Sequence, residues 1–345
     1  MKNKVTLQHI ADRLHLSRTT ISLAVRDHPR ISKATKDKIR ALVRKMGYEP
    51  DLVARSLATG RSSLIGVVVP DSTNAYYSEV IRGIEAAANS AGYSVVLANG
   101  SYDLRIEAAR MSDMIRIGVA GIIAAPAFTS EKPRLDGFWS ELRRNKFPFV
   151  LLNRQLKPTV FTQVSADNIS GMRMAVDALA FLRHRRVAYL YGKRAMVPAR
   201  QRLEVFRRFS KMHRFEQDEQ LVEACDIGPR GGYEACKRLW AKLRIKPTAI
   251  MALSDGEAIG VLRFLKEKGI QVPHEVSVMG FDGFDQSAFT ETSLSTVVTP
   301  MHEIGKRAVE LLHAAIQSGP GSPKTVLLPV KLALRESLGP ALYQS

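Results

Sequence analysis

The N-terminal stretch reads Thr6-Leu-Gln-His-Ile-Ala-Asp-Arg-Leu-His-Leu-Ser-Arg-Thr-Thr-Ile-Ser-Leu-Ala-Val25, and it decides the fold of this part of the chain. Apolar residues recur at helical spacing in both halves of the stretch, at Ile10, Ala11 and Leu14 and again at Ile21, Ala24 and Val25. Thr6 and Ser17 stand where an N-cap hydroxyl would satisfy the free N–H groups of a first helical turn. The pattern therefore predicts two short helices joined by a tight turn, which is a helix-turn-helix.

A third helix and a concentration of positive charge extend this pattern. Ser32 precedes a run with one apolar face, and Gly47 supplies a left-handed stop after it. Residues 1–62 hold 14 Lys and Arg against 5 Asp and Glu, so half of the net charge of +18 lies in this part. A solvated basic surface is the alternative explanation, but the charge coincides with the helix pattern. These observations predict a three-helix module that binds the phosphates of double-stranded DNA.

The composition sets wider bounds. With 345 residues, 45% hydrophobic and 24% charged, the chain has room for two or three domains with sizeable cores. No apolar run approaches the roughly 18–20 residues that span a bilayer, and the N-terminus lacks a signal-like segment. Cys225 and Cys236 have neither metal nor redox spacing. We therefore expect a cytoplasmic protein with no membrane partner, no metal and no cofactor.

Beyond Gly60 the sequence alternates short apolar runs with helical stretches. The predicted strands are Leu64–Pro70, Ser94–Asn99, Gly121–Ala125, Phe149–Asn153, Val187–Tyr191, Leu221–Cys225, Ala249–Leu253 and Val276–Phe281. Short strands separated by helices of 10 to 20 residues predict parallel sheets covered on both faces. Because the strands are too many for one sheet, the predicted class is α/β, with a small all-α headpiece before two doubly wound parallel-sheet subdomains. Ligands of such sheets lie at the carboxyl ends of the strands.

The order and spacing of several motifs from about Val5 to about Arg335 resemble the lac repressor family of transcriptional regulators, with a headpiece and hinge of the purine-repressor kind. The motifs are Leu16-Ser-Arg-Thr-Thr-Ile-Ser22, Val53-Ala-Arg-Ser-Leu57, Ile65-Gly-Val67, Asp167-Asn168 and Val276-Ser-Val-Met-Gly-Phe-Asp282. The resemblance implies a core of periplasmic-binding-protein type.

The resemblance also implies a division of the chain into domains. The implied segments are a headpiece at 1–49, a hinge helix or linker at 50–61 and an effector-binding core at 62–340. The core would consist of an N-subdomain, roughly 62–162 and 294–322, and a C-subdomain, roughly 163–293 and 323–340.

The second helix would enter the major groove, so the resemblance assigns DNA contacts to its first residues. Arg18 and Thr19 would reach base edges, where a guanidinium discriminates guanine by roughly 1–3 kcal/mol. Leu23 stands where many family members carry a polar base-contacting residue, so specificity would be concentrated at Arg18. The remaining headpiece contacts would be made to phosphate or serve as caps, and they are Thr6, Ser17, Thr20, Ser22, Arg26, Arg30 and Ser32.

Residues 50–58 resemble the hinge helix of the family. A segment this short is marginal as an isolated helix in water, so folding on DNA is physically reasonable. Leu57 would insert between base pairs in the minor groove with Ala54 beside it, and the alternative for Leu57 is a linker residue packed on the core. The geometry implies a homodimer on a pseudo-palindromic operator. The C-terminal residues contain no leucine heptads, which favours a dimer over a tetramer.

Effector contacts can be carried over by position. Arg202 would bind two vicinal oxygens with its guanidinium, and Asp282 would accept hydrogen bonds from hydroxyl pairs. The remaining candidates are Tyr76, Tyr77, Asn153, Ser254 and Asp255. Two alternatives stay open at this point: Arg202 could be a solvated arginine, and Asp255 could only cap the helix that follows it.

Enzyme functions find little support in the sequence. The chain has no Gly-x-Ser-x-Gly elbow, no phosphate loop ending in Gly-Lys-Ser/Thr and no His-Glu-x-x-His. The predicted function is a DNA-binding repressor controlled by a small-molecule effector, of which a sugar is the expected class. A solute-binding module without specific DNA recognition and a sugar-active enzyme are the alternatives. The sequence does not distinguish an inducer from a corepressor.

Overall fold

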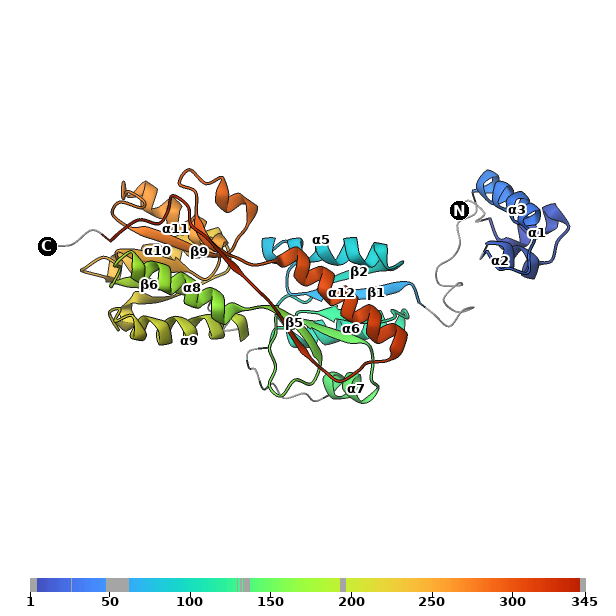
Figure 1. The fold of residues 1–345 in the computed structure, drawn as a ribbon, viewed down its shortest axis with the longest axis horizontal. Helices are drawn as coiled ribbons and strands as arrows, with labels where there is room; N and C mark the ends of the chain where they lie inside the picture. The colour runs from blue at the N-terminus through green and yellow to red at the C-terminus, as the bar shows by residue number, and fades with distance from the viewer. Residues whose placement is uncertain are drawn as a thin grey trace. The chain divides into compact units, whose positions relative to one another are not determined.

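The computed structural model describes residues 5–25, 27–47, 62–128, 130, 132, 137–192 and 197–341. These residues form two units, Met1–Ser62 and Ser63–Ser345, which we call the headpiece and the core (Figure 1). None of the helices in the described ranges is long and apolar enough to cross a membrane.

The headpiece contains the three predicted helices, α1 (Leu7–Leu14), α2 (Arg18–Val25) and α3 (Lys33–Met46). Each presents one apolar face to a shared centre. The fully buried members of this centre are Ile10, Ala11, Ile21, Ala24 and Ile39. Three helices this short are stable only because they pack together, since isolated helices of this length are marginal in water.

Local hydrogen bonds fix where these helices begin and end. Thr6 Oγ1 accepts from His9 N at 3.4 Å, Ser17 Oγ accepts from Thr20 N at 3.0 Å, and Ser32 Oγ accepts from Thr35 N at 3.3 Å. Gly47 ends α3 with φ of 63°, the left-handed conformation that glycine adopts without a steric cost. All four signals are predicted from sequence alone, because capping depends only on neighbouring residues.

The first sheet of the core has strand order β11-β5-β4-β3-β1-β2 and is parallel throughout. Helices α5 (Ala75–Ser90) and α12 (Met301–Ser318) cover one face, while α6 (Leu104–Arg116) and α7 (Phe138–Arg144) cover the other. Figure 1 shows α5 and α12 side by side on this sheet. The strands are β1 (Leu64–Val69), β2 (Ser94–Asn99), β3 (Ile122–Ala124), β4 (Phe149–Leu152), β5 (Thr162–Ala166) and β11 (Thr325–Leu328).

The second sheet has strand order β12-β10-β9-β8-β6-β7. Helices α8 (Asn168–Phe181) and α9 (Val197–Met212) cover one face, while α10 (Pro229–Lys242) and α11 (Asp255–Glu267) cover the other. The strands are β6 (Val187–Gly192), β7 (Val222–Cys225), β8 (Ala249–Ala252), β9 (Ser277–Asp282), β10 (Ser295–Val298) and β12 (Lys331–Ala333). Only β12 runs antiparallel to its neighbour, β10. The predicted class, α/β with two doubly wound sheets, is confirmed.

The sheets correct the predicted boundaries between subdomains. Strand β5 (162–166) belongs to the first sheet, β10 (295–298) to the second and β11 (325–328) to the first. The chain therefore crosses between the sheets near 167, 299 and 329, rather than near 162, 294 and 322. In Figure 1 the last crossing is the red segment that joins the two sheets. The prediction was wrong by several residues because sheet membership depends on long-range hydrogen bonds, which periodicity does not reveal.

Candidate functional site

The start of α2 presents an exposed polar surface. Arg18 and Thr19 are exposed there, while Thr20 and Ser22 are half-buried. The Thr20 hydroxyl is hydrogen-bonded to Ser17 Oγ at 2.8 Å, so this pair already stabilises the first turn. Arg18 has no side-chain partner among the described residues. Its guanidinium is therefore available to an external acceptor, as the prediction of base contact requires.

Not all of the headpiece charge is available to DNA. Asp27 lies in the turn after α2 with φ of 58°, and its carboxylate contacts Lys36 Nζ at 3.0 Å and Arg40 at 2.8 Å. The hydrogen bond and charge of Lys36, together with Arg40, lower the pKa of Asp27. This acid therefore holds the turn against α3 and neutralises part of that basic face. Arg30 is exposed nearby. Arg26, Ala54 and Leu57 lie outside the described residues, so their predicted roles stay predictions.

The core has a cleft at the carboxyl ends of strands from both sheets. It contains most of the predicted effector residues, and side chains from β1, β4, β6, β8 and β9 or from the segments after them contribute to it. The lining residues are Asn74, Tyr76, Tyr77, Tyr102, Asn153, Arg154, Pro198, Ala199, Arg202, Ile227, Leu253, Ser254, Glu257 and Asp282. This is the position where ligands of doubly wound sheets bind.

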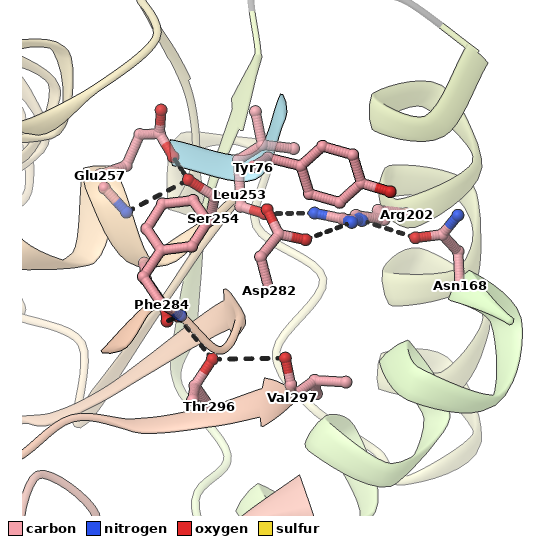
Figure 2. Close-up of polar contacts among 12 residues, drawn as sticks. Tyr76, Asn168, Arg202, Leu253, Ser254, Glu257, Asp282, Phe284, Thr296 and Val297 are labelled. Atoms are coloured by element: carbon pink, nitrogen blue, oxygen red, sulfur yellow. Dashed lines mark hydrogen bonds and ion pairs between the residues drawn. The ribbon is translucent and has the colours of Figure 1, made fainter. Parts of the chain in front are cut away.

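Arg202 is the centre of a buried polar network in this cleft. Its guanidinium donates to Asp282 Oδ1 at 2.8 Å, to the Leu253 carbonyl at 2.8 Å and to Asn168 Oδ1 at 3.0 Å (Figure 2). The guanidinium carbon also lies 3.7 Å from the centroid of the Phe281 ring. Arg202 is 5% exposed, so the alternative of a solvated arginine is wrong. Asn168 belongs to this network although sequence reasoning did not select it as a site residue.

Two cleft residues have left-handed backbone conformations at strand ends. Asn153 follows β4 with φ of 51°, and Asp282 ends β9 with φ of 101°. Such conformations cost about 1–3 kcal/mol for residues other than glycine, and they concentrate at functional sites. Both side chains line the cleft.

Tyr76 contributes an unsatisfied hydroxyl. It is 7% exposed, and its Oη has no hydrogen-bond partner among the described residues. Burial raises the pKa of Tyr76, so the hydroxyl remains a neutral donor. The ring lies next to the Arg202–Asp282 pair (Figure 2). It also packs edge-on against Tyr77, with ring centroids 5.3 Å apart. A buried hydroxyl without a partner in a cleft is available to donate to a bound molecule.

Ser254 caps α11, and its hydroxyl is hydrogen-bonded to Glu257 in the first turn of that helix. Ser254 Oγ accepts from Gly256 N at 3.2 Å and donates to the Glu257 carboxylate, which also accepts from Gly228 N at 2.6 Å. Burial raises the pKa of Glu257. Glu257 was missed as a cleft residue, although the spacing of Ser254 and Glu257 is the sequence signal of a capping box.

Asp255 was wrongly predicted as an effector contact. Its side chain is fully buried, accepts from Phe284 N at 2.7 Å and from the Thr296 hydroxyl, and does not line the cleft. The alternative of a helix cap is also wrong, because the capping oxygen belongs to Ser254. Asp255 instead joins α11 to β10 and to the loop after β9.

This burial gives the core a distinct pH dependence. Burial raises the pKa of Asp255 to about 7, with the nearby Asp282 charge acting in the same direction. The folded state keeps the proton up to about pH 7, whereas the unfolded chain releases it near pH 4. Because the folded state binds more protons, stability falls as pH rises between these values. We expect Asp255 to make the core about 2 kcal/mol less stable at pH 7.5 than at pH 5.5. Urea unfolding at both pH values measures this difference.

Asp255→Asn is the variant that isolates this contribution. Burial also raises the pKa of Glu107 to about 7, so part of the pH dependence remains in the variant. Glu107→Gln removes this second buried carboxyl, and its pH dependence can be compared with that of Asp255→Asn. Equal pH dependence in wild type and Asp255→Asn would contradict the assignment.

The fold and the two sites together define a class of protein. A basic helix-turn-helix unit precedes a core with a polar cleft between two sheets. Proteins built in this way are ligand-responsive DNA-binding regulators.

Comparisons with known proteins agree with this class. Residues 6–51 match "Bacterial regulatory proteins, lacI family", and residues 176–338 match "Periplasmic binding protein-like domain". Catabolite control protein A of Priestia megaterium is 28% identical over 96% of this chain and 99% of its own length. The ribose operon repressor of Bacillus subtilis is 28% identical over 94% of this chain and 96% of its own length.

Solved structures agree on the fold. A lac repressor dimer bound to operator and the anti-inducer ONPF superposes with a TM-score of 0.87 at 24% identity, over 97% of this chain and 99% of that one. A complex of the regulator CelR with cellobiose superposes with a TM-score of 0.71 at 26% identity, over 96% of this chain and 99% of that one. The chain therefore carries a DNA-binding domain of the lacI family together with a periplasmic binding protein-like domain, and it is a DNA-binding transcriptional regulator.

Proposed function

We propose that this regulator is a homodimeric repressor that binds a pseudo-palindromic operator under control of a sugar or sugar derivative. The observation that carries the proposal is the combination, in one chain, of the exposed Arg18 in a basic headpiece and the buried Arg202–Asp282 pair in a polar cleft. Because its proposed partner is DNA, we expect it to act in the cytoplasm.

The effector class follows from the chemistry of the cleft. Asp282 and Glu257 supply carboxylate acceptors, Arg202 and Tyr76 supply donors, and Tyr77 adds an aromatic face. Vicinal hydroxyls donate to and accept from paired groups of this kind, and sugar rings stack on aromatic faces. The ribose operon repressor and the CelR–cellobiose complex are relatives whose names point to the same ligand class.

The mechanism is a shift in population. One ligand state of the core would set the separation of the two hinge segments in the dimer, and so decide whether both headpieces reach their half-sites. By linkage, effector and operator must change each other's affinity by the same factor.

Selection of genomic fragments by the purified full-length chain at moderate salt, followed by sequencing, tests the proposal. Recovery of a pseudo-palindrome, followed by a change in operator affinity with one member of a sugar panel, would support it. Recovery of random DNA alone would refute sequence-specific recognition. A sugar that binds the core without changing operator affinity would refute the mechanism for that ligand.

Arg18→Ala tests the proposed base contact. If the guanidinium bonds to one guanine in each half-site, its loss should cost about 1–3 kcal/mol and relax the preference at that base pair only. Operator variants with a substitution at each position, measured with both proteins, provide the readout. Arg30→Ala, a second exposed arginine, serves as the control that should lower affinity uniformly. A uniform loss for Arg18→Ala would instead make Arg18 a phosphate contact.

A further inference from the structure

The core has a second recess, which lies at the end of the first sheet opposite to the effector cleft. It is formed where β4 and β5 begin, between α7 and the last turns of α12, and its volume is about 530 Å³. Residues 319–324, which lead from α12 to β11, form another side of it. The effector cleft lies at the opposite, carboxyl ends of these strands. The volume lies within the range of about 300–1,000 Å³ that is usual for small-molecule sites.

The floor of this recess is apolar and partly aromatic. It is built from side chains of α7, the loop after it, the segment before β5, and α12, and the main contributors are Leu142, Phe147, Val160, Phe161 and Leu311. Phe147 and Val160 are only half-buried. An organic ring or chain placed here would remove their remaining apolar surface from water, which is favourable in proportion to area.

The rim of the recess carries uncompensated positive charge. Arg143, Lys146 and Lys324 line it and are exposed. None of the three has an acidic partner among the described residues, and no Asp or Glu lines the recess. Arg143 and Lys146 also follow the usual preference of cations for a helix C-terminus, here that of α7. Lys324 belongs to the loop before β11, so that preference does not account for it.

We propose that this recess binds a small organic anion with a flat apolar body, independently of the effector cleft. The apolar part lies on the Phe147 side of the floor, and the anionic group is held by Arg143, Lys146 and Lys324. The ligand is expected to be an anion, because three cationic side chains line the recess and no acidic side chain lines it. The apolar floor excludes a bare inorganic ion as the preferred ligand.

Isothermal titration of the full-length chain with three probes tests both parts of the site. The probes are naphthalene-2-carboxylate, its neutral analogue naphthalene-2-carboxamide, and inorganic phosphate. We expect the carboxylate to bind about tenfold more tightly than the amide, with a loss of affinity at high salt. Equal affinities for carboxylate and amide, or phosphate binding as tight as that of the carboxylate, would overturn the proposal. So would a carboxylate that does not bind.

Matched variants locate the binding. Lys146→Ala and Lys324→Ala should each weaken carboxylate binding about fivefold, whereas Arg144→Ala, an exposed cation outside the lining, should leave it unchanged. Ala314→Trp should fill the recess and abolish binding, while Gln317→Trp, on the same helix but outside the lining, should not. All five positions are exposed, so folding is preserved. Binding that survives Ala314→Trp, or that responds equally to Arg144→Ala and Lys146→Ala, would place the anion elsewhere and overturn the assignment.

Discussion

Replacing Arg202 with methionine is expected to abolish the response to effector and to lower the stability of the core by about 3–5 kcal/mol. The guanidinium is buried and satisfies Asp282, Asn168 and the Leu253 carbonyl at the same time. Its removal leaves the Asp282 carboxylate, 5% exposed, without its counter-charge. An unpaired buried charge costs more than the pair contributed. Urea unfolding measures the stability, and effector titration of the operator complex measures the response.

Two further variants separate folding from ligand binding. Arg202→Lys keeps the charge but loses the planar donor geometry, so it should fold better than the methionine variant while still weakening effector binding. Arg207→Met removes a half-exposed arginine from the same helix, and this arginine is paired with the exposed Glu219. The substitution should change the stability of the core by less than about 1 kcal/mol. A normal effector response in Arg202→Lys and Arg202→Met would exclude Arg202 from the effector site.

Replacing Leu57 with alanine should lower operator affinity by roughly 100-fold while changing non-specific DNA affinity by less than about threefold. If Leu57 inserts between base pairs, its loss removes the contacts that offset the cost of unstacking, which is a few kcal/mol at each step. Non-specific binding depends mainly on phosphate contacts, which the substitution leaves in place. Fluorescence anisotropy with operator and random duplexes, at one salt concentration, gives both affinities.

Leu52→Ala is the matched control, since it removes the same side chain from the same hinge segment. It should affect operator affinity far less than Leu57→Ala. If Leu57→Ala lowers the affinity for operator and for random DNA equally, Leu57 is a linker residue and does not insert between base pairs.

The sequence predicts best what neighbouring residues decide together. Thr6, Ser17, Ser32 and Gly47 cap helices as predicted, because a cap needs only a hydroxyl or a left-handed residue at one position. The buried runs of β1 and β8 were recognised because a parallel strand covered on both faces is continuously apolar. By contrast, β11 has alternating burial and β12 is three residues long, so neither stands out in the sequence.

Helix α11 shows where sequence reasoning about the site ends. Ser254, Asp255 and Glu257 are all polar residues at the start of one helix, and the sequence predicted two of them as ligand contacts. The structure directs Ser254 and Glu257 to the cleft and Asp255 to Thr296 and Phe284. Successive helical residues point about 100° apart, so the direction of each depends on how the helix packs.

The sequence by itself determined eight of the twelve strands that the structure describes, the helix caps and the concentration of basic charge in the headpiece, and it missed β5, β10, β11 and β12. These follow from side-chain chemistry and period over a few neighbouring residues. Only the tertiary structure decided which strands share a sheet, which acids face the cleft, and that Arg202 contacts residues 34, 51 and 80 positions away. The physical reason is that such contacts form between segments distant in sequence, and their geometry is fixed by packing of the whole core.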